Sequence, residues 1–147
     1  MTAVGYQIRR VHGRSELHAA MDLRYQVFCL EQGVPRREER DGRDGNSKAL
    51  HLVAVAGSEV LGTCRLVFAG RTVQFSRLAV RTSSRRRGIA TALLEEAERE
   101  TRAGGADRIV LHAQTYALPL YEGAGYETRG PRFVEAGIEH IAMEKTL

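Results

Sequence analysis

An amphipathic segment between two apolar runs constrains the fold of this chain more than any other feature of the sequence. The segment Gly88–Arg102 repeats apolar residues at helical spacing, and Gly104 and Gly105 end it. The runs before and after it, Thr72–Val80 and Arg108–Ala113, have the character of strands. A strand–helix–strand crossover places its two strands side by side and parallel. We therefore expect an α/β fold with a mixed, twisted sheet flanked by helices.

Further strand-like runs lie on both sides of this unit. The breaks Gly57-Ser58 and Ala69-Gly70 have hairpin length, so the runs that they separate and Thr72–Val80 should form an antiparallel meander. The other expected strands are Tyr6–Val11, His51–Ala56, Val60–Phe68, Tyr126–Arg129 and Ile138–Lys145. The last two should pair with each other at the end of the chain.

Two other helical segments are expected. Ser15 is a suitable N-cap for a helix over Glu16–Glu31, and Tyr116–Glu122 reads as a short helix that Gly123 ends. Residues 33–46 form a polar, charged loop in which a short helix has only weak support.

The composition is that of a single globular domain over residues 1–147. Of these 147 residues, 43% are hydrophobic and 27% charged, and no apolar run reaches the roughly 18 residues that would span a membrane. Arg9 and Arg10 interrupt the start of the chain, so a signal peptide is not expected there. The two cysteines, Cys29 and Cys64, are too few for a disulfide framework. Together with the lack of an apolar membrane-spanning run, this leads us to expect a soluble, cytoplasmic protein without membrane association.

Positive charge is concentrated immediately before the amphipathic helix, at Arg85, Arg86 and Arg87, and Gly88 follows. The start of a helix presents free backbone N–H groups, and a glycine there lets the backbone approach a phosphate closely. Arginines add charge-assisted hydrogen bonds. The pattern indicates a site for a diphosphate-like anion, but it matches neither a P-loop nor a dinucleotide fingerprint.

At these residues the chain resembles the GCN5-related N-acetyltransferases (GNAT). Their pyrophosphate motif is similar to Arg85-x-x-Gly88-x-Ala90, here preceded by Leu78-Ala79-Val80. A second family segment, Asn-x-x-Ala-x-x-x-Tyr-Glu-x-x-Gly-Phe, is similar to residues 114–126, where Gln114 replaces the asparagine. The two segments occur in the family's order.

A third set of residues is similar to the ElaA-type branch of this family. It comprises residues 23–28, residues 31–35 and Gly137-Ile138-Glu139-His140, where Glu139 replaces a common proline. The resemblance covers nearly the whole chain. It implies a sheet splayed between its fourth and fifth strands, where the pantetheine arm of the cofactor enters.

The resemblance implies that acetyl-CoA donates its acetyl group directly to an amine of a small molecule or peptide, with no metal ion. Tyr121 would protonate the departing sulfur, because a phenol is protonated at neutral pH. The cofactor would contact Leu78, Ala79, Val80, Arg85, Arg86, Arg87, Gly88, Ile89, Ala90 and Gln114.

Several points stay open at this stage. Some family members carry a glutamate base on the strand corresponding to Val73–Val80, which here has no acidic residue. Glu31, His112 and His140 are the weak candidates for the base. The acidic segment Glu31–Asp44 suggests a cationic amine acceptor.

The alternatives are a same-fold enzyme with another acyl donor and a basic module that binds nucleic acid. The basic run is short and has no interleaved aromatic residues, so a nucleic-acid partner is not expected. Whether the chain is a monomer or a homodimer is left open.

Overall fold

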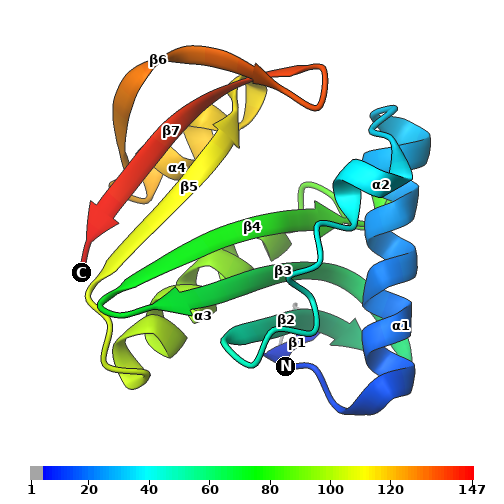
Figure 1. The fold of residues 1–147 in the computed structure, drawn as a ribbon. Coiled ribbons are helices and arrows are strands. Elements are labelled where there is room, and N and C mark those ends of the chain that lie inside the picture. The colour runs from blue at the N-terminus through cyan, green and yellow to red at the C-terminus, as the bar shows by residue number, and fades with distance from the viewer. Residues whose placement is uncertain (1–4) are drawn as a thin grey trace.

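In the computed structural model, which describes residues 5–147, seven strands form one mixed sheet in the order β1-β2-β3-β4-β5-β7-β6 (Figure 1). The strands are β1 (Gln7–Arg10), β2 (Ala49–Ala56), β3 (Glu59–Ala69), β4 (Thr72–Val80), β5 (Arg108–Gln114), β6 (Glu127–Glu135) and β7 (Ile138–Thr146). The expected antiparallel meander is present as β2, β3 and β4.

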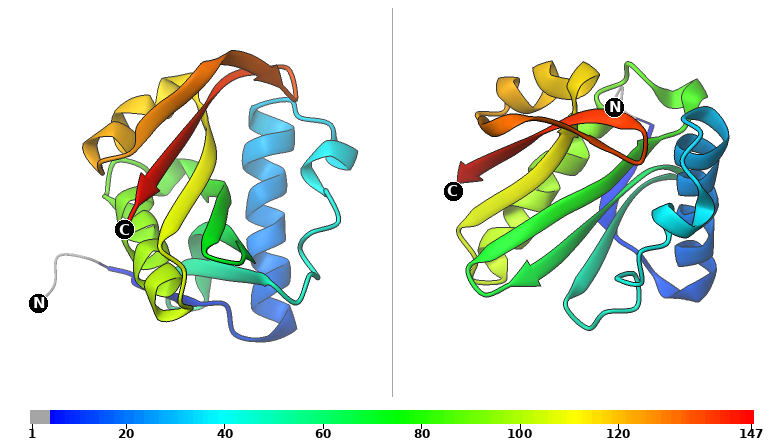
Figure 2. Two further views of the ribbon diagram at one scale, coloured as in Figure 1. Left: turned by 60° about the vertical axis from the view of Figure 1, so that its left-hand side comes forward. Right: turned by 45° about the horizontal axis from the view of Figure 1, so that its top comes forward.

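Helices cover both faces of the sheet, as the turned views in Figure 2 show. The helical elements are α1 (Gly13–Arg24), η1 (Tyr25–Glu31), α2 (Arg36–Glu39), η2 (Thr82–Ser84), α3 (Ile89–Ala103), η3 (Thr115–Ala117) and α4 (Leu118–Gly123). Helix α1 packs on one face through a small cluster that includes Leu23, Val27 and Val53. Helices α3 and α4 cover the other face, where the larger core lies.

The crossover predicted from the sequence is confirmed, and it explains where the sheet opens. Strands β4 and β5 are parallel neighbours, but they pair only from Thr72–Arg108 to Gln74–Val110. Beyond Gln74, β4 continues along β3 while β5 continues along β7, and the two strands diverge in Figure 1. The splay expected between the fourth and fifth strands is therefore present.

A bulge in β4 accompanies this divergence. The register between β3 and β4 shifts between Thr63 and Arg65, opposite Ser76 and Ala79. Arg77 lies in the bulge with φ of 59°, a conformation that non-glycine residues seldom adopt. Bulges bend the strand that carries them, so the bulge turns the second half of β4 away from the course of its first half.

Gly62 on β3 allows α3 to lie close to the sheet. A Cβ atom on this residue would lie 2.8 Å from Cγ2 of Ile89 and 3.2 Å from Cδ1 of Leu93. Both of these side chains are buried at the start of α3. Gly62 therefore sets how closely the first turns of α3 approach the sheet. The position of the arginine-rich turn before α3 follows from this distance.

Three expectations about local structure were wrong. Ser15 is not the N-cap of α1, because the helix begins at Gly13, and Glu16 instead accepts a 2.7 Å hydrogen bond from the backbone N–H of His12. The expected regular helix over Glu16–Glu31 widens into a π-helix at Tyr25. Strand β6 does not end at Arg129. It continues past an irregularity that contains Pro131, which an edge strand tolerates.

Candidate active site

A cavity of about 480 Å³ lies where β4 and β5 part. Side chains from both halves of the sheet and from the segment after α1 line it. They include Phe28, Glu39, Asp41, Arg43, Arg65, Gln74, Ser76, Leu78, His112, Gln114, Tyr121, Glu135 and His140. The structure thus brings the predicted residues Leu78, Gln114 and Tyr121 together at one site.

The arginine-rich turn lies at the end of β4, where α3 begins. Gly88 is the N-cap of α3, with φ of 80°, and no side chain of residues 5–147 caps this helix end. The first backbone N–H groups of a helix have no intrahelical acceptor, so those of Ile89 and Ala90 remain available. The Nε atom of Arg85 donates to the carbonyl oxygen of Val80 at 3.0 Å, which holds the turn against the end of β4.

The three arginine side chains have different surroundings. Nη1 and Nη2 of Arg85 donate to the carboxylate of Glu31 at 2.6 and 2.7 Å. The guanidinium of Arg87 lies over the ring of Tyr6, 6.0 Å from its centroid, whereas Arg86 has φ of 63°. These contacts correct two expectations about Glu31, that it is a candidate base and that it belongs to the acidic side of the acceptor pocket. Its carboxylate binds Arg85 in the arginine-rich turn, and Glu31 is not among the residues that line the cavity.

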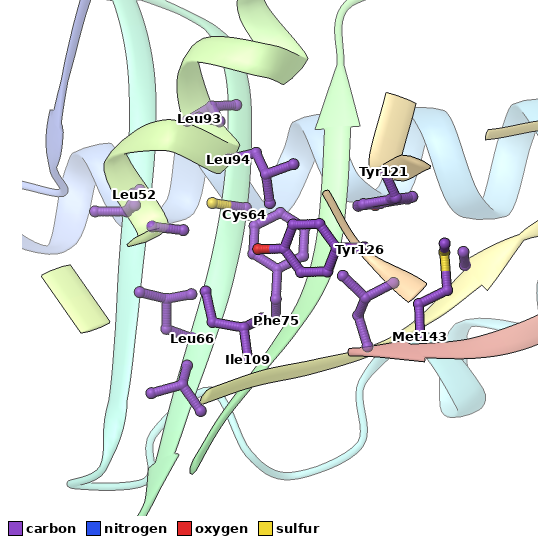
Figure 3. Packing of buried hydrophobic residues seen from close by; sticks show 14 of the residues in the cluster. Leu52, Cys64, Leu66, Phe75, Leu93, Leu94, Ile109, Tyr121, Tyr126 and Met143 are labelled. Atoms are coloured by element: carbon purple, nitrogen blue, oxygen red, sulfur yellow. The ribbon is translucent and has the colours of Figure 1, made fainter. Parts of the chain in front are cut away.

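Tyr121 is buried in α4 at the floor of the cavity. Its ring is packed edge-on against Phe75 and Tyr126, with centroids 6.3 and 6.0 Å away (Figure 3). Burial, followed by the nearby Cys64 and Tyr116, raises the pKa of Tyr121 above its ordinary value of 10. The hydroxyl therefore stays protonated at neutral pH, as a proton donor requires.

Gln114 ends β5 and forms a reciprocal amide pair with Gln32. Nε2 of Gln114 donates to Oε1 of Gln32 at 2.9 Å, and Nε2 of Gln32 donates back at 3.2 Å. The pair joins the segment after η1 to β5, on the far side of the opening. Sequence reasoning placed Gln114 at the site but gave no sign of Gln32 as its partner.

A network of ion pairs extends from the cavity wall and fixes the acidic loop. The guanidinium of Arg65 binds the carboxylate of Asp41 through two hydrogen bonds of 2.8 Å. Arg24 binds Glu39 at 2.6 Å and Asp44 at 2.7 Å, and Arg77 adds contacts to Glu39 and Asp41. Arg24 and Arg77 are thus members of a structural ion-pair network. Arg65 was missed, although an isolated arginine within an apolar strand is a signal for such a pair.

This pairing removes the charge argument for a cationic acceptor. The charged side chains that line the cavity are three carboxylates and three guanidinium groups: Glu39, Asp41, Glu135, Arg43, Arg65 and Arg77. Burial opposes ionisation of Asp41, but hydrogen bonds from Arg65 and from the backbone N–H of Arg43 outweigh it and lower its pKa. The charged side chains that line the cavity therefore balance, and the carboxylates of the loop leave it with no net negative charge.

Two histidines lie on the C-terminal side of the cavity. Nδ1 of His112 on β5 is 3.1 Å from a carboxylate oxygen of Glu135 on β6. Nδ1 of His140 on β7 contacts the carbonyl oxygen of Ile138 at 2.7 Å. The ring of Phe133 contacts both imidazoles, edge-on to His112 at 5.0 Å and stacked on His140 at 5.9 Å. The sequence gave both histidines but not Glu135 or Phe133.

Neither a metal centre nor a membrane span is found within residues 5–147. No group of three or more His, Cys, Asp or Glu side chains in this range has an arrangement that could hold a metal ion. None of its helices has the length and apolar character needed to cross a membrane. Cys29 and Cys64 are both free thiols.

Comparison with known proteins identifies the family. Residues 15–147 match the family described as "Acetyltransferase (GNAT) domain", and the chain belongs to this family of acetyltransferases. It is 33% identical over 131 residues to the uncharacterized N-acetyltransferase YjcF of Bacillus subtilis, covering 88% of this chain and 92% of YjcF.

Solved structures show the same fold. An acyl-CoA N-acyltransferase from Pseudomonas aeruginosa superposes with a TM-score of 0.85 at 26% identity, over 96% of this chain and 98% of that one. Escherichia coli ElaA gives a TM-score of 0.86 at 22% identity, over 95% and 99% of the two chains. A Thermoplasma acidophilum PaiA N-acetyltransferase in complex with coenzyme A gives 0.76 at 18% identity, over 97% and 99%.

Proposed function

We propose that this protein transfers the acetyl group of acetyl-CoA to an amine acceptor by direct transfer. The observation that carries this proposal is the course of β4. Past Gln74 no strand of residues 5–147 pairs with its edge toward β5, and this edge leads from the cavity to the start of α3. A thioester cofactor with a long arm and a diphosphate fits that path, because its amide groups can pair with a strand edge and its phosphates with helix N–H groups.

The chemistry follows from the groups at the two ends of the path. The diphosphate would bind at the turn that contains Arg85, Arg86 and Arg87. The backbone N–H groups there come from Gly88, Ile89 and Ala90. The backbone of Leu78, Ala79 and Val80 would hold the pantetheine arm, and Gln114 the opposite side. The amine attacks the thioester carbon, a backbone N–H near Val80 stabilises the oxyanion, and Tyr121 protonates the sulfur as the C–S bond breaks.

The acceptor is proposed to be an amine of a small molecule or peptide in the cavity between β4 and β5. Because the cavity has balanced charge, neutral and zwitterionic amines belong in the search as well as cationic ones. A cytoplasmic location remains our expectation, and two free cysteines are compatible with it.

Two measurements test the proposal. Acetyl-CoA and CoA should raise the melting temperature, since a ligand that binds the native state stabilises it by mass action. Release of free thiol from acetyl-CoA should then depend on an added amine, with propionyl-CoA and malonyl-CoA as comparison donors. Unchanged melting at millimolar acetyl-CoA, together with no amine-dependent thiol release, would contradict the proposed function.

A further inference from the structure

We propose that His112 is the general base of this enzyme and that Glu135 positions it. The inference rests on the proposed function and deepens it, because direct transfer needs a group that takes the proton of the attacking amine. Strand β4 presents Gln74 and Ser76 to the cavity, and neither side chain is a base at neutral pH. His112 faces the same cavity from β5, across the opening.

The carboxylate of Glu135 determines which nitrogen of His112 can act. An ionised carboxylate only accepts hydrogen bonds, so the 3.1 Å contact requires a hydrogen on Nδ1 of the imidazole. In the neutral ring, Nε2 then carries the lone pair. The same carboxylate stabilises the imidazolium that forms when Nε2 takes a proton. This is the arrangement of a histidine base held by an acidic partner.

Glu135 reaches His112 from the second strand along the sheet. Strand β7 lies between β5 and β6, and its residue Ala142 is paired with His112, whereas Glu135 is paired with Ile138. The side chains of Phe133 and Glu135 reach past β7 and contact the imidazole. The ring of Phe133 packs edge-on against His112 and fixes the plane of the imidazole.

His140 is less suited to the same role. Its Nδ1 contacts the neutral carbonyl of Ile138, and His140 is buried, whereas His112 is exposed. A buried imidazole with no carboxylate partner gains little compensation when it is protonated. We therefore assign His140 to the support of Phe133 through the stacking of their rings.

The proposed step is balanced in protons and bonds. As the C–N bond forms, Nε2 of His112 accepts the proton that the amine loses. The C–S bond breaks, and the sulfur takes the proton of Tyr121. The imidazolium loses its proton to water and the tyrosinate regains one, so the products are the N-acetyl amine and the free thiol of CoA.

The test compares two acceptors in single-turnover reactions. One is the most active primary amine from a panel of methylamine, ethanolamine, 2-phenylethylamine, glycinamide and putrescine. The other is hydroxylamine, which is largely unprotonated at neutral pH and needs little base assistance. His112→Gln should slow transfer to the alkylamine by about 10²–10³-fold and transfer to hydroxylamine by less than about 10-fold.

Glu135→Gln should slow transfer to the alkylamine by about 10-fold and transfer to hydroxylamine by less than about 2-fold, because the imidazole loses the carboxylate that orients it. The carboxylates of the neighbouring strands on this side are Glu135 of β6, which contacts His112, and Glu144 of β7. Glu144 binds Arg108 and Arg129, and their hydrogen bonds lower its pKa, so it does not titrate in the neutral range.

The matched control is Glu139→Gln, which removes a carboxylate of β7 that pairs with Arg132 at 3.1 Å. This variant should keep the rates of the parent with both acceptors. The assignment of His112 and Glu135 is overturned if His112→Gln keeps the parent rate with both acceptors, or if His140→Gln and not His112→Gln selectively slows transfer to the alkylamine. A parent protein that binds acetyl-CoA but transfers to no acceptor, or does not bind it, instead overturns the proposed function.

Discussion

The carboxylate of Glu31, at the end of η1, binds both terminal nitrogens of Arg85 in the turn before α3. The two residues are 54 positions apart, and each side chain is partly exposed, 42% for Glu31 and 36% for Arg85. The pair therefore joins the segment beside the acceptor cavity to the proposed phosphate site. An incoming diphosphate must compete with Glu31 for this arginine.

Glu31→Ala should consequently tighten the binding of CoA. An exposed ion pair contributes about 1 kcal/mol or less, so the gain should be at most about fivefold in Kd and should shrink at high salt. Isothermal titration calorimetry at two salt concentrations measures it. Asp107→Ala, which removes another exposed pair, with Arg71, is the control and should leave the Kd unchanged. Weaker binding by Glu31→Ala would show that Arg85 needs this partner.

Gly88→Glu should abolish most of the rise in melting temperature that CoA produces. The substitution adds a negative charge and a side chain where the phosphates are expected. Gly88 has φ of 80°, so any other residue also introduces backbone strain of about 1–2 kcal/mol. Gly88→Asn controls for this strain, since asparagine tolerates the left-handed conformation better than most residues. Equal CoA binding by the parent and by Gly88→Glu would mean that the phosphate site lies elsewhere.

Tyr121→Phe should slow the chemical step while leaving the affinity for CoA nearly unchanged. The ring and its contacts with Phe75 and Tyr126 are kept, and only the hydroxyl is lost. The single-turnover rate should fall by about 10²–10⁴-fold. Burial, then the interactions with Cys64 and Tyr116, raises the pKa of Tyr121, so the ratio of the two rates should stay constant up to about pH 10. An unchanged rate at neutral pH would restrict Tyr121 to packing.

The stability of the protein should fall as the pH decreases, in two stages. Burial lowers the pKa of His51 below its ordinary 6.5, so the unfolded chain binds this proton first and stability declines below about pH 6.5. For Asp41 and Asp44, burial opposes ionisation, but hydrogen bonds from Arg65 and Arg24 respectively prevail and lower both pKa values. The unfolded carboxylates take up protons near 3.8, so a second decline should begin below about pH 4.5.

Melting temperatures measured from pH 8 to pH 3 check this prediction. His51→Gln should remove the first stage and leave the second. Arg65→Met should weaken the second stage, because Asp41 loses its bidentate partner. A melting temperature that is constant down to pH 4 in the parent would contradict the role assigned to His51.

Local patterns in the sequence were sufficient for the crossover of β4, α3 and β5, for the turn at Gly88 and for the segment that carries Tyr121. Each depends on the spacing of residues within one helix, strand or turn, and such short-range order can be derived from the chain itself. The same reasoning failed for β6. An edge strand continues past Pro131 only if its partner strand β7 provides hydrogen-bonding groups there, and local sequence does not determine this.

Only the tertiary structure decided which charged groups are free to act. Glu31 and the acidic loop were predicted to face the acceptor, but Arg85, Arg24, Arg65 and Arg77 bind their carboxylates. The pairing of His112 with Glu135 likewise depends on strand order and register, which bring together residues 23 positions apart from either side of β7. Charge pairing depends on distances of a few ångströms between separate elements, and the sequence alone does not contain those distances.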